Sequence, residues 1–118
     1  MTITELEEKR LEFTESRYNK LVKKLNNFEK MPKQEIIRTM LILSIWKPDQ
    51  TILVARKKSV FRFWGKQNQF VLDIIDALLS FKNIINFSEE TINYLENKAN
   101  SVDVSTYCEQ LEKKLKKV

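Results

Sequence analysis

One stretch of the chain, from Gln50 to Phe70, combines side chain types that suit a binding task. It contains no acidic residue, and its positive side chains are interspersed with aromatic ones. Such a combination can hold phosphates and stack bases at the same time. The cations are Arg56, Lys57, Lys58, Arg62 and Lys66, and the aromatic residues are Phe61, Phe63, Trp64 and Phe70. The stretch therefore favours a binding role over a catalytic one.

The residues on which most enzymes rely are scarce. The chain has no histidine, one cysteine and one glycine, which excludes Ser-His and Cys-His triads, a thiolate zinc site and a glycine-rich phosphate loop. Asp73 and Asp76 could bind a divalent cation, but two acids three residues apart are more typical of the solvated edge of a helix. Cys108 lies on an apolar stripe, as a buried structural thiol would. We expect no enzymatic activity, no metal site and no cofactor.

Length and composition predict a single domain spanning residues 1–118. One glycine and two prolines supply too few turn residues for many short strands. The expected fold is all-α, a compact bundle of five or six helices. A lone cysteine fits a cytoplasmic location, and no apolar run approaches the roughly 20 residues that cross a bilayer. We therefore expect a soluble chain without a secretory signal.

Capping signals and apolar periodicity place the helices. Thr4 and Glu7 form a capping box that predicts the start of the first helix, and Pro32 ends it. The second and fourth helices are the most apolar and should form the core. Ser88 is an expected N-cap, with Phe87 stapled onto Ile92. The expected ranges are 4–31, 32–47, 49–64, 68–85, 88–99 and a last helix from Ser101 or Asp103.

The segment after Lys47 has two interpretations. Pro48 can open a helix over residues 49–64, with Gly65 as its C-terminal cap. Alternatively, Pro48 and Asp49 can form a type I turn in a hairpin between LILSIW and TILVARKK, whose residues have β-propensity. The helical neighbours and the low stability of an isolated hairpin favour the helix.

The net charge of +5 is unevenly distributed. Residues 1–30 contain 7 basic and 6 acidic residues, residues 31–72 contain 8 basic and 2 acidic, and residues 73–118 contain 6 basic and 8 acidic. The excess in the middle third indicates an anionic partner. A solvated basic face that serves solubility would have the same composition.

The basic stretch divides into expected core and expected contact residues. Val60, Phe63 and Trp64 are most simply core residues, since aromatic residues at helical spacing usually pack inside. Exposed Phe61 or Phe70 would stack on bases. Phosphate contacts are expected from Arg56, Lys57, Lys58, Arg62 and Lys66, with Lys33 and Arg38 extending the track and the lysines near the C-terminus forming a weaker second patch.

A compact, basic, all-helical chain with the segment ARKKSVFRFWGK resembles the small helical subunit of CRISPR–Cas effector complexes. The resemblance implies a non-enzymatic subunit of a ribonucleoprotein, present in several copies beside other protein subunits. Its basic side chains would steady RNA or single-stranded DNA. The last third departs from this picture, because its net charge of −2 would have to face a protein neighbour.

Two other functions fit the same residues. A protein-interaction bundle, such as an inhibitor, immunity or scaffold protein, would dock its basic face on an acidic partner. A helix-turn-helix protein would place residues 49–64 in the major groove of DNA and would need to dimerise.

Overall fold

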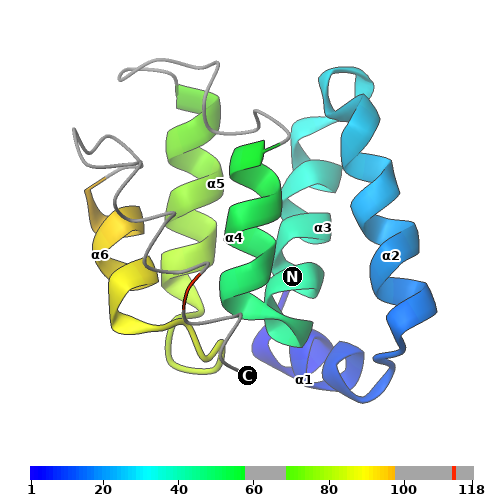
Figure 1. The fold of residues 1–118 in the computed structure, drawn as a ribbon, viewed down its shortest axis with the longest axis horizontal. Helices are drawn as coiled ribbons and strands as arrows, with labels where there is room; N and C mark the ends of the chain where they lie inside the picture. Colours follow the sequence, from blue (N-terminus) through cyan, green and yellow to red (C-terminus); the bar gives the residue numbers. More distant parts are fainter. Residues whose placement is uncertain (58–68, 98–112, 114–118) are drawn as a thin grey trace.

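The computed structural model describes residues 1–57, 69–97 and 113, and every regular element in that part of the chain is helical (Figure 1). The expected all-α class is confirmed. The elements are α1 (Ile3–Leu11), α2 (Glu15–Lys24), the 3-10 helix η1 (Leu25–Lys30), α3 (Lys33–Trp46), α4 (Pro48–Lys57), α5 (Gln69–Ser80) and α6 (Glu89–Glu96). The expected last helix, with Cys108 and most of the terminal lysines, lies outside the described residues.

Helix α3 is the centre of the bundle. It contacts α1, α2, α4 and α5, and in Figure 1 it lies between α2 and α4 with α1 across its lower end. An apolar surface on nearly all sides drives this position, since each side must be covered. The prediction of a central helix from Pro32 to Lys47 is therefore confirmed. Its buried residues are Ile36, Thr39, Met40, Leu41, Ile42, Leu43, Ser44 and Ile45.

The chain continues after α3 as a helix and not as a hairpin. Pro48 is the first residue of α4, and the N–H of Thr51 donates to the carbonyl oxygen of Lys47 at 3.0 Å. Ile52, Leu53 and Ala55 are buried. The helical interpretation is correct as far as Lys57, and the rest of the expected helix, Gly65 and Asn68 fall outside the described residues.

The expected first helix is wrong in two respects. It begins earlier, because the hydroxyl of Thr2, not Thr4, caps it by accepting from the N–H of Glu5 at 3.2 Å. It also breaks, and the hydroxyl of Thr14 caps a new helix by accepting from the N–H of Arg17 at 3.0 Å. An unbroken helix to Pro32 would be roughly 40 Å long, about twice the length of α3. The break lets the chain lay two shorter helices against α3.

The remaining boundaries differ less from expectation. Helix α5 ends at Ser80, before the expected Ile85, and a series of turns then buries Ile85. Ser88 caps α6 as predicted, its hydroxyl accepting from the N–H of Thr91 at 3.2 Å. The N–H of Ser88 also donates to Oδ1 of Asp49 at 2.9 Å. This bond ties the start of α6 to the start of α4.

Successive helices around α3 alternate in direction, which sorts their ends into two groups. Helices α2 and α4 end at the top of Figure 1, where α3 and α5 begin. We call this the upper end: the last turns of α2 and α4, η1, and the first turns of α3 and α5. The lower end holds α1, the first turns of α2, α4 and α6, the last turn of α3 and residues 81–88. The ion pair between Lys47 and Glu15, at 2.9 Å, joins two elements of the lower end.

We expect Leu43→Ala to lower the free energy of unfolding by about 2–5 kcal/mol, because Leu43 is fully buried in α3. Leu11→Ala makes the same chemical change at a side chain that is 86% exposed, and should alter stability by less than about 0.5 kcal/mol. Urea denaturation of both variants measures the difference. Equal effects would contradict the central position of α3.

We expect Ser44→Ala to stabilise the protein by up to about 1 kcal/mol. The Ser44 hydroxyl is buried in α3 without a hydrogen-bond partner among the described residues. On folding it therefore loses its hydrogen bonds to water, and no hydrogen bond within the described part of the protein replaces them. Thr51→Val is the matched change, because the buried hydroxyls of Thr51 and Tyr18 lie 3.3 Å apart and bond to each other. It should cost about 1 kcal/mol. Thermal denaturation that ranks the two variants in the opposite order would contradict this assignment.

Candidate nucleic-acid interface

The structure describes part of the predicted interface. Arg56 and Lys57 form the end of α4, at the upper end of the bundle, with Lys57 exposed and Arg56 half-buried. Lys33 and Arg38 are exposed on α3. The predicted contact residues Lys58, Phe61, Arg62 and Lys66, and the side chain of Phe70, lie outside what is described.

The predicted extension through Lys33 and Arg38 is engaged by acids of the same chain. Nζ of Lys33 donates to Oδ2 of Asp73 at 2.8 Å, and Nε2 of Gln69 donates to Oδ1 of the same carboxylate at 2.8 Å. Hydrogen bonds first from Lys33 and then from Gln69 hold the pKa of Asp73 below its ordinary value. Arg38 lies 3.8 Å from a carboxylate oxygen of Glu5. These two cations therefore add little to any excess of positive charge.

The upper end gathers cations that have no such partner. Among the described residues, no acid lies within ion-pair distance of Lys23, Lys24, Lys30 or Arg56. With Lys33 and Lys57, the described cations at this end number six, against the acids Glu29, Glu35 and Asp73. We call Lys23, Lys24, Lys30 and Arg56 the unpaired cation cluster. The upper end thus has an uncompensated positive charge.

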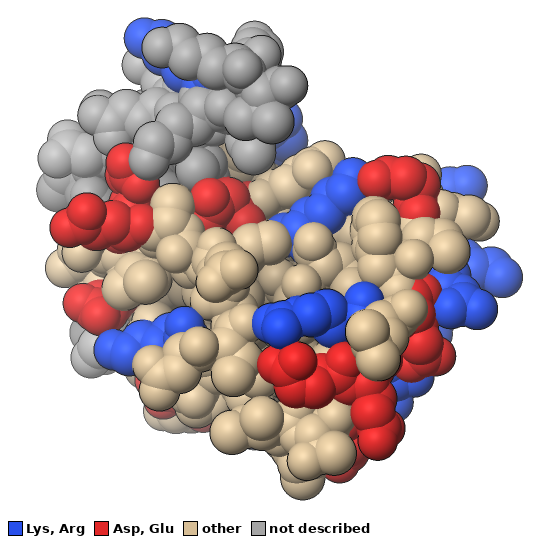
Figure 2. All heavy atoms as spheres, turned by 90° about the horizontal axis from the view of Figure 1, so that it is seen from below, with Lys and Arg blue, Asp and Glu red and all other residues tan. Residues whose placement is uncertain are grey.

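The lower end is organised differently. Figure 2 views the molecule from this end and shows Asp and Glu lying beside Lys and Arg over much of the described surface. Printed distances agree with the picture, since Lys9 pairs with Glu12 at 3.1 Å and Arg10 with Glu7 at 3.1 Å. Arg10 also donates through Nη2 to the carbonyl oxygen of Ile84, which fastens α1 to the loop after α5. Lys9, Arg10 and Lys47 are therefore neutralised within the chain.

Helix dipoles do not account for the positive charge at the upper end. Lysines in the last turn of a helix are favoured by the partial negative charge of its carboxyl end, which explains Lys23 and Lys24 individually. However, two helices end and two begin at the upper end, so their partial charges of opposite sign largely cancel. The field in front of this end is therefore set mainly by side chains.

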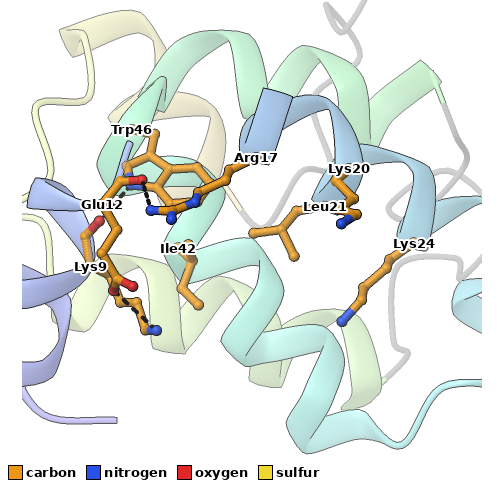
Figure 3. Close-up of a pocket in the computed structure, with 8 residues that line it drawn as sticks. All are labelled: Lys9, Glu12, Arg17, Lys20, Leu21, Lys24, Ile42 and Trp46. Carbon is orange, nitrogen blue, oxygen red and sulfur yellow. Dashed lines mark hydrogen bonds and ion pairs between the residues drawn. The ribbon is translucent and has the colours of Figure 1, made fainter. Parts of the chain in front are cut away.

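A groove of about 260 Å³ lies between α1, α2 and α3, and its lining extends from α1 at the lower end to Lys24 in the last turn of α2 (Figure 3). Three apolar side chains line it, Leu21 from α2 and Ile42 and Trp46 from α3. Four cations and one acid surround these apolar side chains. The complete lining is Lys9, Glu12, Arg17, Lys20, Leu21, Lys24, Ile42 and Trp46.

Most polar groups of the groove wall near α1 are already engaged. Nε1 of Trp46 donates to the carbonyl oxygen of Lys9 at 2.7 Å, and Nη1 of Arg17 donates to that of Glu12 at 2.7 Å. Lys9 is neutralised by Glu12. On the α2 side, Lys20 and Lys24 extend beside Leu21 and make no ion pair with a described residue (Figure 3). The groove therefore joins an apolar lining to available positive charge.

Reasoning from sequence missed this groove, although a signal was present. Arg17, Lys20, Leu21 and Lys24 have the spacing of one helical face, on which a polar stripe flanks an apolar residue. Trp46 was assigned to an expected core helix, and the structure leaves it half-buried with its ring edge-to-face on Phe13, the centroids 5.8 Å apart.

The structure adds no evidence for the predicted alternative of a divalent-cation site at Asp73 and Asp76. Asp73 is engaged by Lys33 and Gln69, and Asp76 is exposed on the same helix. No group of three or more potential metal ligands occurs among the residues described. Within the same ranges, none of the helices has the length and apolar character needed to span a membrane.

The chain was compared with models of protein families, with curated proteins and with solved structures, and none of the three comparisons gives a match. Functional inference therefore depends on the chain's own residues and geometry.

We expect Lys33→Met to raise the pKa of Asp73 toward its ordinary value, because the largest interaction that lowers this pKa is removed. Since the pKa of Asp73 is lower in the folded than in the unfolded protein, the Lys33–Asp73 pair stabilises the fold at pH values above the unfolded-state pKa. This contribution disappears as the pH falls through the native pKa. Carbon-detected NMR titration of the carboxyl group measures the pKa directly. Lys30→Met, a change at the same end outside this pair, should leave it unmoved.

Proposed function

We propose that this protein is a non-enzymatic subunit that binds the phosphate backbone of RNA or single-stranded DNA within a larger assembly. The observation that carries the proposal is the unpaired cation cluster at the upper end. Cations without internal partners can exchange their counterions for phosphates, which is the main source of sequence-independent affinity. Cations already paired with carboxylates gain less from the same exchange.

The position of the basic stretch strengthens the proposal. Lys57 and Gln69, the described residues that flank residues 58–68, both lie at the upper end. The sequence between them adds Lys58, Arg62 and Lys66 and no acid. These cations therefore belong to a segment whose two attachment points adjoin the cluster.

The resemblance to the small helical subunit of CRISPR–Cas effector complexes supports a ribonucleoprotein as the assembly. In such a role the cationic end would face the nucleic acid, and less positive surfaces would face protein neighbours. The lower end suits the second task because Lys9, Arg10 and Lys47 are paired with acids of the chain and because this end exposes apolar side chains. Ile3 is 58% and Leu11 86% exposed there.

The same exposed apolar side chains favour a protein-interaction bundle as the second candidate. Isolated exposed leucines are ordinary, but Met1, Ile3, Leu11 and Phe13 are all exposed on or beside the single helix α1. Major-groove recognition by α4 has less support. Within Pro48–Lys57, only Gln50 and Lys57 are exposed, which leaves this part of the helix little surface to present to bases.

We expect replacement of the unpaired cation cluster (Lys23, Lys24, Lys30 and Arg56) by glutamine to weaken binding to labelled single-stranded RNA or DNA by about tenfold or more at low salt. The slope of log affinity against log salt should become shallower by about 0.7 for each lost phosphate contact. Fluorescence anisotropy titrations over a range of salt concentrations measure both quantities.

The matched control replaces four ion-paired cations outside the groove, Arg10, Arg38, Lys47 and Lys82, by glutamine. It removes the same net charge, so a response to total charge alone would affect both variants equally. Circular dichroism establishes that each variant is folded. Equal loss in the two variants, or no binding by the unmodified protein, would refute the proposal.

A further inference from the structure

We infer that the groove between α1, α2 and α3 receives one unstacked base of a single strand, whose adjoining phosphates lie against Lys20 and Lys24. This inference rests on the proposed function and narrows it to single-stranded nucleic acid. A base in a duplex is paired and stacked, so it cannot enter a groove on a protein surface without leaving the helix.

The lining has the chemistry that holds a base without reading its identity. Leu21, Ile42 and the indole ring of Trp46 offer apolar contact, and every base has a flat face that can use it. The one polar atom of the indole already donates to the carbonyl oxygen of Lys9. Trp46 therefore supplies ring surface but no hydrogen bond that would distinguish one base from another.

The charges of the groove suit a phosphate-linked ligand. Lys9 is neutralised by Glu12, so three cations of the lining exceed the acids: Arg17, Lys20 and Lys24. Lys20 and Lys24 are one helical turn apart on the same face of α2 and lie on the same side of Leu21 in Figure 3. A single nucleic-acid strand likewise combines apolar base faces with charged phosphates. A neutral apolar ligand would leave this positive charge unmatched.

The size and position of the groove also support the binding of a single base. At about 260 Å³ the groove is smaller than the roughly 300–1,000 Å³ of sites for drug-sized ligands, which fits a single base better than a dinucleotide. Lys24 belongs both to the groove and to the unpaired cation cluster. A strand held by the cluster therefore reaches the groove without crossing an acidic surface of α2, whose one acid, Glu15, lies at the opposite end of the helix.

The test compares two DNA strands of equal length and charge, one of thymidines and one with abasic sites in place of the bases. We expect the thymidine strand to bind about tenfold more tightly by fluorescence anisotropy, because only it can fill the groove. In NMR spectra it should shift the indole N–H signal of Trp46 and the methyl signals of Leu21 and Ile42. The abasic strand should leave these signals nearly unchanged.

Lys20→Gln and Lys23→Gln are the matched variants, since both remove one unpaired cation from α2 and only Lys20 lines the groove. Lys20→Gln should reduce the preference for thymidines over abasic sites by severalfold, because Lys20 reaches the adjoining phosphate only when a base occupies the groove. Lys23→Gln should weaken binding of both strands alike and preserve the preference. Both changes are at exposed positions, so the folded structure should be retained.

The outcomes separate the inference from the proposed function. Equal binding of both strands without a Trp46 shift would overturn base insertion and leave backbone binding intact. Binding of neither strand would overturn the proposed function as well. The inference would also be overturned if duplex DNA bound as tightly as the single strand. It would likewise be overturned if polyglutamate, and neither DNA strand, shifted the NMR signals of the groove residues. In the polyglutamate case the groove would belong to the protein-interaction alternative.

Discussion

Burial of α3 on nearly all sides is the constraint on which the rest of the structure depends. A helix that is apolar all round must be covered all round, and α1, α2, α4 and α5 supply the cover. Short connections to α3 then force α2 and α4 to run opposite to it. This packing requirement decides which helix ends share one end of the molecule, and with them which charges lie together.

The separation of paired and unpaired charges follows from that arrangement. At the lower end, Lys47 meets Glu15 from another helix, while Lys9 and Arg10 meet acids of their own segment. Exposed ion pairs of this kind contribute little to stability, typically less than about 1 kcal/mol. Their main consequence here is electrostatic, because they neutralise one end and leave the net positive charge to the other.

Two features of the described surface support the proposed binding role. The upper end offers cations without internal partners, and the groove between α1, α2 and α3 offers apolar surface with cations along one side. Lys24 links the two features. A backbone ligand with apolar side groups, such as a nucleic-acid strand, has the complementary order of charge and apolar surface.

The sequence by itself determined the helical class, the central helix, the Ser88 cap and the cationic middle third, because these follow from local periodicity, capping chemistry and composition. It failed at the first helix, where Thr2 and Thr4 are each followed three residues later by a glutamate, so that the local pattern does not distinguish the two, and the structure has Thr2 as the cap. Tertiary structure alone decided that Lys33 meets Asp73, forty positions away, and that Lys20 and Trp46 line one groove. Such contacts join separate helices, so they depend on how the core packs and have no counterpart in local sequence.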